Sequence, residues 1–375
     1  GHNLRGALVG NALRTATQTT SRQPTVVVIG SGLAGLSAAI SAAEAQDPTV
    51  QVVVLEKNNK LGGNSAKATS GINSVNIGAR DSINRFVEDT IKAGHNSGNL
   101  ELATLMASKS REALSWLNDQ VGGEGLTNCV RGGGHSVPRT LRFSPGDDGR
   151  PRPVGWTLIS ALTKEALSKP NIRVLKGIEC TGIIMDEKSN TVKGVRYRRV
   201  GSESVLAEDE ELYSDSIVLA SGGFAASVEL LKKYAPNLAE LPTTNGPWAT
   251  GDGLRIAEKV GAKTRDLIHV QVHPTGFLNP SNPSNKSVFL APEALRACGG
   301  LLISPRTGKR FANELLPRDL LSEAIFENGL PLEEWDKKHN PSSSTKDVCD
   351  STERKGEEEL VTNGEKSQDD GDKKK

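Results

Sequence analysis

The chain has 375 residues, of which 46 are basic and 45 acidic, so its formal net charge is +1. This balance excludes a global field that would attract nucleic acid or an anionic membrane, and no apolar run approaches the roughly 20 residues of a membrane helix. We therefore expect no nucleic-acid partner and no membrane insertion. The four cysteines lie far apart and form no CxxC or His/Cys cluster, so we expect free thiols and no metal.

Residues 1–23 differ in composition from the rest of the chain. They contain Arg5, Arg14 and Arg22 but no acidic residue, and they are rich in Ser and Thr. This composition is typical of the remnant of a mitochondrial transit peptide. A first residue that is not Met equally favours a disordered leader or an expression scar. The expected location is therefore mitochondrial, with a cytoplasmic location as the alternative.

Residues 25–56 have the order strand, glycine turn, helix, strand. An apolar run leads into Gly-Ser-Gly-Leu-Ala-Gly at 30–35, a helix is predicted over 36–45, and a second apolar run over 50–54 leads to Leu55 and an acid. This order is typical of a dinucleotide-binding β-α-β unit. A glycine turn with a purely structural role is the alternative.

Each glycine of this turn has a separate predicted role. Gly30 permits the sharp turn, Gly32 lets the backbone approach a pyrophosphate, and Gly35 allows the helix to pack closely on the strand. The helix N-terminus offers its amides to the phosphate charge. The acid at the end of the second strand, Glu56, would accept hydrogen bonds from a ribose hydroxyl.

Residues 57–73 indicate which dinucleotide is bound. An NAD domain usually continues into a crossover helix, whereas flavoproteins often have a second glycine pair there, and Gly62 and Gly63 provide one. Residues 66–73 are mostly small and polar, which suits a backbone packed against an isoalloxazine ring. A Gly/Ser loop without ligand is the alternative. Here the chain resembles the soluble fumarate reductases of the succinate dehydrogenase/fumarate reductase flavoprotein family, most closely the fungal type.

The resemblance implies FAD as the cofactor. Membrane-bound relatives attach FAD through a histidine, and this chain has Asn64 at the matching position, so we expect non-covalent FAD. The expected cofactor-binding residues are Gly30, Gly32, Leu33, Ala34, Gly35, Glu56, Lys57, Asn64, Ser65, Thr69, Ser70, Gly71 and Asp252.

The middle of the chain has an α/β pattern. Helical spacing predicts helices over 99–119 and 158–167, and apolar runs predict strands over 172–175, 192–200 and 216–220, with a hairpin whose turn contains Asn190. With the resemblance, this predicts a Rossmann-like, glutathione-reductase-type FAD-binding domain over 24–267. The beginning of an α+β capping domain would follow over 268–332. Residues 333–375 are Ser-rich and then highly charged, so we expect a disordered tail.

Later motifs carry the expected chemistry. Residues 133–139 resemble a segment that lies along the flavin, and His273 resembles the family's substrate-carboxylate ligand. Glu293 and Arg296 are three apart, so on a helix they can pair. The resemblance implies that they relay protons to Arg318, which protonates fumarate after hydride transfer from flavin N5, giving succinate. A solvated Glu/Arg pair without function is the alternative.

The chain also departs from the family pattern. The resemblance runs from about Pro24 to Asn328, and the later segments that supply a second carboxylate-binding His and Arg are missing. Arg139 or Arg142 could replace them, although no physical argument favours either. Two hypotheses stay open: a truncated fumarate reductase, from which we expect little turnover, or an inactive product that binds FAD weakly. No motif identifies the electron donor, so free reduced flavin or a partner reductase is expected.

Overall fold

The structure, a computed structural model, describes residues 23–123, 125–201, 209–282 and 285–331. The chain divides into two units, Gly1–Leu330 and Pro331–Lys375, and every element named below belongs to the first. The predicted leader, apart from Gln23, and the predicted tail over 333–375 lie outside the described residues.

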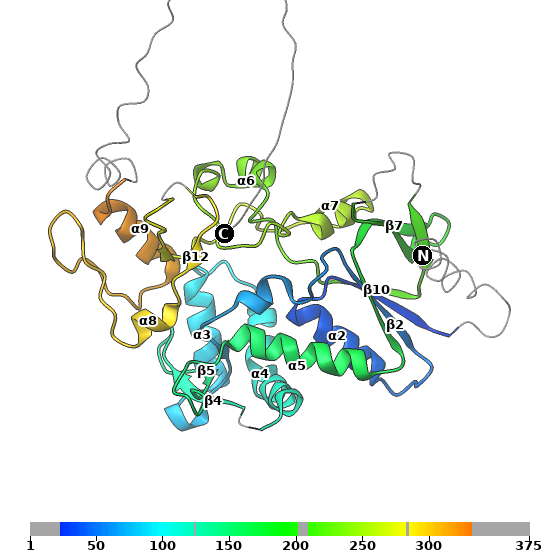
Figure 1. Cartoon of the computed structure of the whole chain (residues 1–375), viewed down its shortest axis with the longest axis horizontal. Coiled ribbons are helices and arrows are strands. Elements are labelled where there is room, and N and C mark those ends of the chain that lie inside the picture. Colours follow the sequence, from blue (N-terminus) through cyan, green and yellow to red (C-terminus); the bar gives the residue numbers. More distant parts are fainter. Residues whose placement is uncertain (1–22, 124, 202–208, 283–284, 332–375) are drawn as a thin grey trace, which may run out of the picture. The chain divides into compact units, whose positions relative to one another are not determined.

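A four-stranded parallel sheet forms the centre of the first unit (Figure 1). Its strands, in spatial order, are β10 (Ser216–Leu219), β1 (Thr25–Ile29), β2 (Gln51–Glu56) and β6 (Ile172–Lys176). Val28 on β1 pairs in register with Val54 on β2, and both are fully buried. Continuous apolar runs of this kind suit a parallel sheet that is covered on both faces. The predicted α/β class is confirmed.

Helix α2 (Leu33–Ala43) connects β1 to β2 and begins directly after the glycine turn. The start predicted at Leu36 is therefore too late. The backbone of Gly32 is extended, with φ −68° and ψ −175°, and this residue is the N-cap. The prediction missed the first turn, which follows the Gly32 N-cap directly and in which Leu33 packs against the buried cluster.

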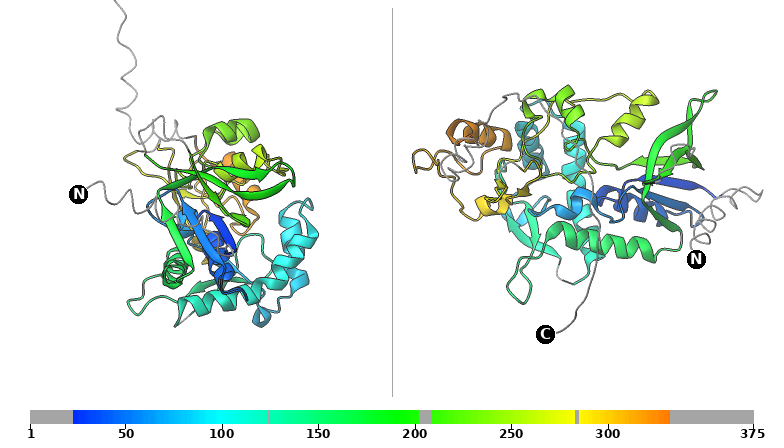
Figure 2. Two further views of the ribbon diagram at one scale, coloured as in Figure 1. Left: turned by 90° about the vertical axis from the view of Figure 1, so that its right-hand side faces the viewer. Right: turned by 45° about the horizontal axis from the view of Figure 1, so that its top comes forward.

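Helices α2 and α5 (Val154–Ser168) cover one face of the sheet, and α4 (Leu100–Val121) packs on α5. Leu36, Leu117 and Leu158 from these three helices belong to one buried cluster with the strand valines. Figures 1 and 2 show α2 and α5 side by side. The helices predicted over 99–119 and 158–167 are confirmed, with α5 beginning one turn earlier.

The opposite face of the sheet carries an antiparallel sheet of β7 (Ile178–Asp186), β8 (Thr191–Arg199) and β9 (Glu210–Tyr213). Ile178 and Val195 from this sheet pack on Val27 and Val53 of the parallel strands. The predicted hairpin is confirmed, and its turn contains Asn190 with a left-handed φ of 51°.

A second group of elements surrounds a small sheet, ordered β3 (Ile72–Asn73), β5 (Thr140–Phe143), β4 (Leu126–Val130). Helix α3 (Ile83–Ala93) packs on α4 through Phe86 and Ala107. Short 3-10 helices occupy Gly63–Lys67, Ile77–Ala79 and Pro236–Leu238.

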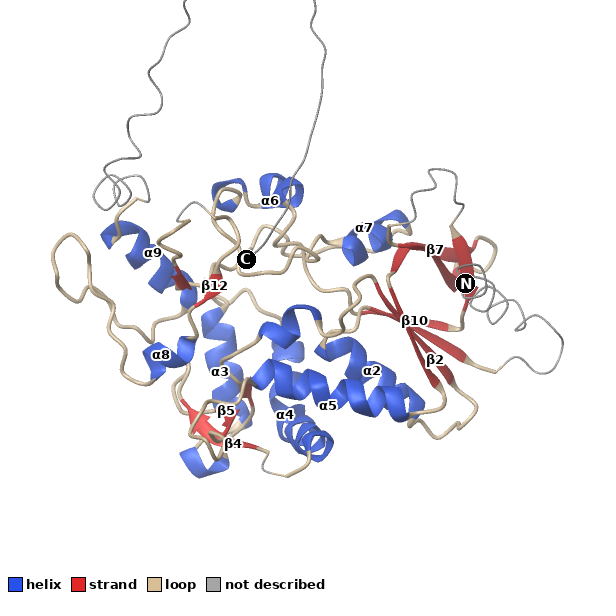
Figure 3. Ribbon diagram, in the orientation of Figure 1, coloured by secondary structure: helices blue, strands red, loops and turns tan. Residues whose placement is uncertain are grey.

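The remainder of the first unit is largely loop (Figure 3). Its elements are α6 (Val228–Tyr234), α7 (Asp252–Lys259), the pair β11 (Gly276–Phe277) and β12 (Phe289–Leu290), α8 (Glu293–Ala297) and α9 (Arg318–Asn328). The boundary predicted at 267/268 falls inside this unit and stays a prediction. Among the described residues, no helix combines the length and the apolar character that crossing a membrane requires.

Candidate active site

The glycine turn opens onto a first cavity of about 260 Å³. Its walls include residues 29–34, 55–58, 63–65 and 220–223, together with Trp248 and Asp252. Most of the predicted cofactor-binding residues therefore lie around one space at the carboxyl end of the parallel strands. This is where open α/β sheets bind their ligands.

The three glycines differ in what surrounds them. Gly30 has φ +100°, and a Cβ there would lie 2.4 Å from the carbonyl oxygen of Ala220. A Cβ on Gly35 would lie 1.9 Å from the carbonyl oxygen of Gly30, so helix and strand are in direct backbone contact. A Cβ on Gly32 meets nothing closer than the Ser65 hydroxyl at 3.3 Å. Only the Gly32 position leaves room for a ligand against the backbone.

Glu56 holds the turn in place. Its Oε2 accepts hydrogen bonds from the Ser31 amide (3.1 Å) and hydroxyl (2.5 Å), and its Oε1 accepts from the Asn58 amide (2.8 Å) and side chain (2.9 Å). The side chain is buried on the cavity wall. A ribose hydroxyl at the predicted position would therefore bind a carboxylate that already accepts hydrogen bonds from Ser31 and Asn58.

The far wall of this cavity is polar, and its side chains are hydrogen-bonded to their neighbours. Lys57 Nζ lies 2.5 Å from the Asp252 carboxylate and 2.8 Å from the Thr250 hydroxyl. Asn64 donates to the Asn245 side chain (2.6 Å) and accepts from the Gly246 amide (2.9 Å). These contacts fix the side chains that would border a dinucleotide.

Two observations test whether this cavity fits a flavin dinucleotide. The indole Nε1 of Trp248 is buried and has no hydrogen-bond partner among the described residues, although Trp248 lies on the cavity wall. Gly32 leaves the start of α2 open, where backbone amides favour an anion. An orphaned donor and an accessible helix N-terminus fit a ligand with acceptor atoms and a pyrophosphate. Thr69, expected at the cofactor, lies on the wall of neither this cavity nor the next.

A second cavity, also about 260 Å³, contains the expected chemistry. Its walls include Ser70, Gly71, residues 132–135, Gln271, Glu293, Arg318 and Asp319. The charged and polar side chains on these walls suit a polar substrate.

Glu293 and Arg318 form an ion pair in this cavity. Arg318, the first residue of α9, donates from Nη2 to Glu293 Oε2 (3.0 Å) and from Nη1 to Gln271 Oε1 (3.2 Å). Glu293 Oε1 accepts from the Gly133 amide. Burial raises the pKa of Glu293, but the hydrogen bonds from Gly133 and Arg318 outweigh it, so the net pKa is lowered and the carboxylate stays charged.

The expected pairing of Glu293 with Arg296 is wrong. Arg296 Nη1 donates to the carbonyl oxygen of Glu314 (2.7 Å), and its Nε and Nη2 are buried without a partner among the described residues. Burial and the charge of Arg318 lower the pKa of Arg296. Helical spacing put the two on one face, but the carboxylate is drawn to Arg318 and Gly133, which only the tertiary fold brings near it.

His273 lies on another wall. It borders a neighbouring cavity of about 240 Å³ with Leu241 and Phe326, and its Nδ1 lies 2.9 Å from the carbonyl oxygen of Thr275. Burial and the nearby charge of Arg318 lower its pKa. The structure thus places His273 close to Arg318 but not on the wall of the second cavity, and its predicted carboxylate contact stays a prediction.

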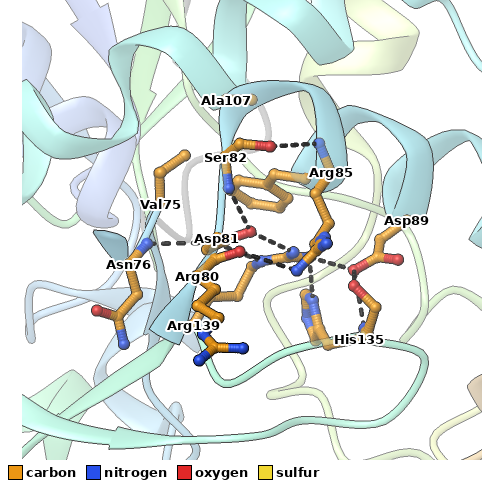
Figure 4. A network of polar contacts seen from close by, with 12 residues as sticks. Val75, Asn76, Arg80, Asp81, Ser82, Arg85, Asp89, Ala107, His135 and Arg139 are labelled. Carbon is orange, nitrogen blue, oxygen red and sulfur yellow. Dashed lines mark hydrogen bonds and ion pairs between the residues drawn. The ribbon is translucent and has the colours of Figure 1, made fainter. Parts of the chain in front are cut away.

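Arg139 is unavailable as a substrate ligand. Its side chain is fully buried, with Nε and Nη2 on Asp81 (3.0 and 2.8 Å) and Nη1 on Asp89 (2.6 Å), as Figure 4 shows. The suggestion that it replaces a second carboxylate ligand is therefore wrong. Arg142 lies on β5 and on the wall of neither main cavity.

Three residues on the wall of the second cavity were not predicted from the sequence: Gln271, His135 and Asp319. Gln271 and His135 lie inside the segments that resembled the family, so proximity to these motifs was a usable signal. Asp319 follows Arg318 directly and contacts His95. No pattern along the chain could show that contact, because the partners are 224 residues apart.

Comparison with known proteins gives the family. The FAD binding domain family matches residues 25–339, so the chain belongs to this family and FAD is its cofactor. The open conformation of a flavocytochrome c3 fumarate reductase superposes with a TM-score of 0.66 at 26% identity, covering 90% of this chain and 58% of that one. The predicted Rossmann-like FAD-binding fold is confirmed.

The most similar relatives include fungal enzymes. Fumarate reductase 1 of Saccharomyces cerevisiae is 41% identical over 310 residues, 80% of this chain and 63% of that protein. Fumarate reductase of Schizosaccharomyces pombe is 36% identical over 323 residues, 84% of this chain and 61% of that protein. The resemblance drawn from the motifs is confirmed, and the chain spans less than two thirds of the length of these relatives.

Proposed function

We propose that this chain carries the catalytic part of an FAD-dependent fumarate reductase. The observation that carries the proposal is Arg318 on the wall of a polar cavity, fixed by Glu293 and Gln271. Similarity to the two fungal fumarate reductases supports the choice of substrate. When bound, FAD supplies the hydride for reduction of the substrate double bond.

The residues of the first cavity hold the cofactor in this proposal. Gly32 leaves the backbone open for the pyrophosphate, and Glu56 borders the ribose. Lys57, Asn64 and Asp252 provide a rigid polar wall, because each is already fixed by a neighbour. Among the described residues, no histidine lies on this wall. This supports non-covalent binding of FAD.

Arg318 has two roles in the second cavity. Its guanidinium attracts a substrate carboxylate, and its Nη protons are available to the substrate carbon that needs one. A guanidinium is a very weak acid, so a proton that Arg318 gives up must be replaced at once. Glu293, in direct hydrogen-bond contact with Arg318, would first take up a proton that enters from solvent and then pass it to Arg318, with buried Arg296 nearby.

The electron donor and the cellular location complete the proposal. Free reduced flavin or a partner reductase would supply electrons, because the sequence carries no second nucleotide motif and no haem or iron–sulfur motif. The basic, acid-free leader supports a mitochondrial location, with a cytoplasmic one as the alternative.

A single-turnover experiment tests the activity. The FAD-loaded chain is reduced without oxygen and mixed with fumarate, and flavin re-oxidation is followed by absorbance near about 450 nm. Fumarate should oxidise the wild-type protein, whereas Arg318→Ala should slow this step by at least about 100-fold, the usual contribution of a general acid. Bound FAD should be unchanged, because Arg318 is not on the wall of the first cavity.

Arg150→Ala is the matched control, since this side chain is 86% exposed and borders neither main cavity. Equal rates of flavin re-oxidation for wild type and Arg318→Ala would refute the assignment of Arg318 as the proton donor. A wild-type protein that holds FAD but is not oxidised by fumarate would favour the alternative, a flavin-binding chain without catalysis.

A further inference from the structure

His135 connects the buried Arg139 network to the second cavity. The half-buried ring forms part of the cavity wall, and its Nδ1 lies 2.9 Å from Nη1 of Arg139. Figure 4 shows His135, Asp81 and Asp89 around the same guanidinium. Arg139 itself does not border the cavity. His135 is therefore the member of this network that a ligand can reach.

The contact with Arg139 fixes the tautomer of His135. A guanidinium has only donors, and it keeps its charge at every relevant pH. Nδ1 must therefore be the acceptor, because two N–H groups pointed at each other at this distance would repel. A neutral imidazole with an acceptor at Nδ1 carries its proton at Nε2. The network thus produces a histidine with a defined donor on its other nitrogen.

The Nε2–H group belongs to a ring on the cavity wall and is not a buried atom without a partner. No hydrogen bond joins Nε2 to any described residue. The nearby backbone donors are already used, since the Gly133 amide binds Glu293 and the Gly134 amide binds the Leu315 carbonyl oxygen. His135 therefore offers a donor that the protein itself leaves unused.

We propose that His135 Nε2–H binds one carboxylate of a dicarboxylate substrate while Arg318 binds the other. This rests on the proposed function and deepens it, because it names the groups that would recognise the two ends of the substrate. Both groups border one cavity, and they come from segments far apart in the chain. A neutral donor adds a hydrogen bond without a second positive charge beside Arg318. His135 is a specificity-determining residue in this view.

The charges around His135 keep it neutral. Burial and the positive charge of Arg139 lower its pKa, and they outweigh Asp89, Glu293 and Asp81, which act in the opposite direction. The donor at Nε2 is then present without protonation of the ring. Since an unperturbed histidine titrates near about 6.5 and the pKa of His135 lies lower, its contribution to binding should not vary between about pH 7.5 and 8.5.

Two substitutions separate a binding role from a structural one. His135→Asn can keep an acceptor near the Nδ1 position, and with it the bond to Arg139, but it has no group at the Nε2 position. His135→Gln can place an amide donor near the Nε2 position. Succinate binding to the oxidised, FAD-loaded chain is measured by calorimetry, with butyrate as the monocarboxylate probe. His269→Asn, at an exposed histidine outside both main cavities, is the matched control.

His135→Asn should weaken succinate binding by about 10-fold or more, as expected for one hydrogen bond to a charged group, and leave FAD binding intact. His135→Gln should stay within about 3-fold of wild type, because a donor is retained. The ratio of succinate to butyrate affinity should fall only in His135→Asn. Succinate affinity that is unchanged in His135→Asn would overturn the inference while the proposed function stands.

The other outcomes are also decisive. A wild-type chain that binds no succinate would overturn the inference together with the proposed substrate. A wild-type chain that binds succinate through His135 but does not transfer hydride to fumarate would keep the inference and refute the proposed activity. Should His135→Asn fail to fold, loss of the succinate preference in His135→Leu, with flavin absorbance retained, gives the same decision.

Discussion

At the scale of single residues, the glycine turn shows how position decides the role of one residue type. Gly30 and Gly35 are required by the fold, since any Cβ there would overlap backbone atoms. Gly32 differs, because other residues can adopt its extended backbone and a Cβ there would meet only the Ser65 hydroxyl, at 3.3 Å. The two kinds of glycine position predict different mutant phenotypes.

Gly32→Val should lower FAD affinity by about 100-fold or more, equivalent to about 2.7 kcal/mol, because the side chain would enter the space left for the pyrophosphate. Its unfolding free energy without FAD should change by less than about 1 kcal/mol. Gly35→Ala should instead destabilise the protein by at least about 3 kcal/mol through overpacking. Urea unfolding and FAD titration of both variants check this. FAD bound normally by Gly32→Val would contradict the assigned cofactor site.

At the scale of elements, one buried arginine joins three segments. Arg139 precedes β5, Asp81 precedes α3, and Asp89 lies within α3. The guanidinium also stacks on Phe86, 4.6 Å from the ring centroid. Since Arg139 supplies the positive charge beside both carboxylates, the position of α3 against the small sheet depends on this cluster.

Arg139→Leu should destabilise the protein by about 3–5 kcal/mol at pH 7, because it leaves buried carboxylates uncompensated. Burial raises the pKa of Asp81 and Asp89, but their hydrogen bonds, including those from Arg139, outweigh it and lower both below 3.8. The stabilisation is therefore present above that pH and lost as the pH falls further. Urea unfolding should give unfolding free energies of wild type and variant that differ at pH 7 and converge as the pH falls below about 4.

Arg150→Leu supplies the comparison for this experiment, since its exposed side chain should contribute less than about 1 kcal/mol. Equal stability of Arg139→Leu and wild type at pH 7 would show that the carboxylates find other partners.

At the scale of the whole molecule, cofactor and fold should be linked. The first cavity is built from segments that span residues 29 to 256, so a ligand there contacts much of the parallel sheet and its connections. A ligand that binds only the folded chain stabilises it by mass action.

FAD at 100 times its dissociation constant should therefore raise the unfolding free energy by about 2.7 kcal/mol. Thermal unfolding of the 375-residue chain with and without added FAD measures this change. Riboflavin, which lacks the pyrophosphate and adenosine, should have much less effect. The gain should be absent in Gly32→Val. A melting temperature that does not respond to FAD would mean that the cavity is not the cofactor site.

The sequence by itself determined the elements whose signal is local. The apolar runs gave β1, β2, β6 and β10, helical spacing gave α4 and α5, and the glycine turn with its following acid gave the dinucleotide unit. These predictions succeed because burial imposes a period on the chain within a single element. The boundaries were less accurate, as at α2, because the ends of a helix depend on local capping and not on the apolar period.

Only the tertiary structure decided the partners of the polar residues. Glu293 contacts Arg318, 25 residues away, in place of its helical neighbour Arg296, and Arg139 is enclosed by carboxylates 50 and 58 residues away. The physical reason is that a buried charge takes the partner that the packing of distant loops brings within reach. Periodicity carries no information about that choice, so the catalytic pair and the place of His135 on the cavity wall emerge only from the folded chain.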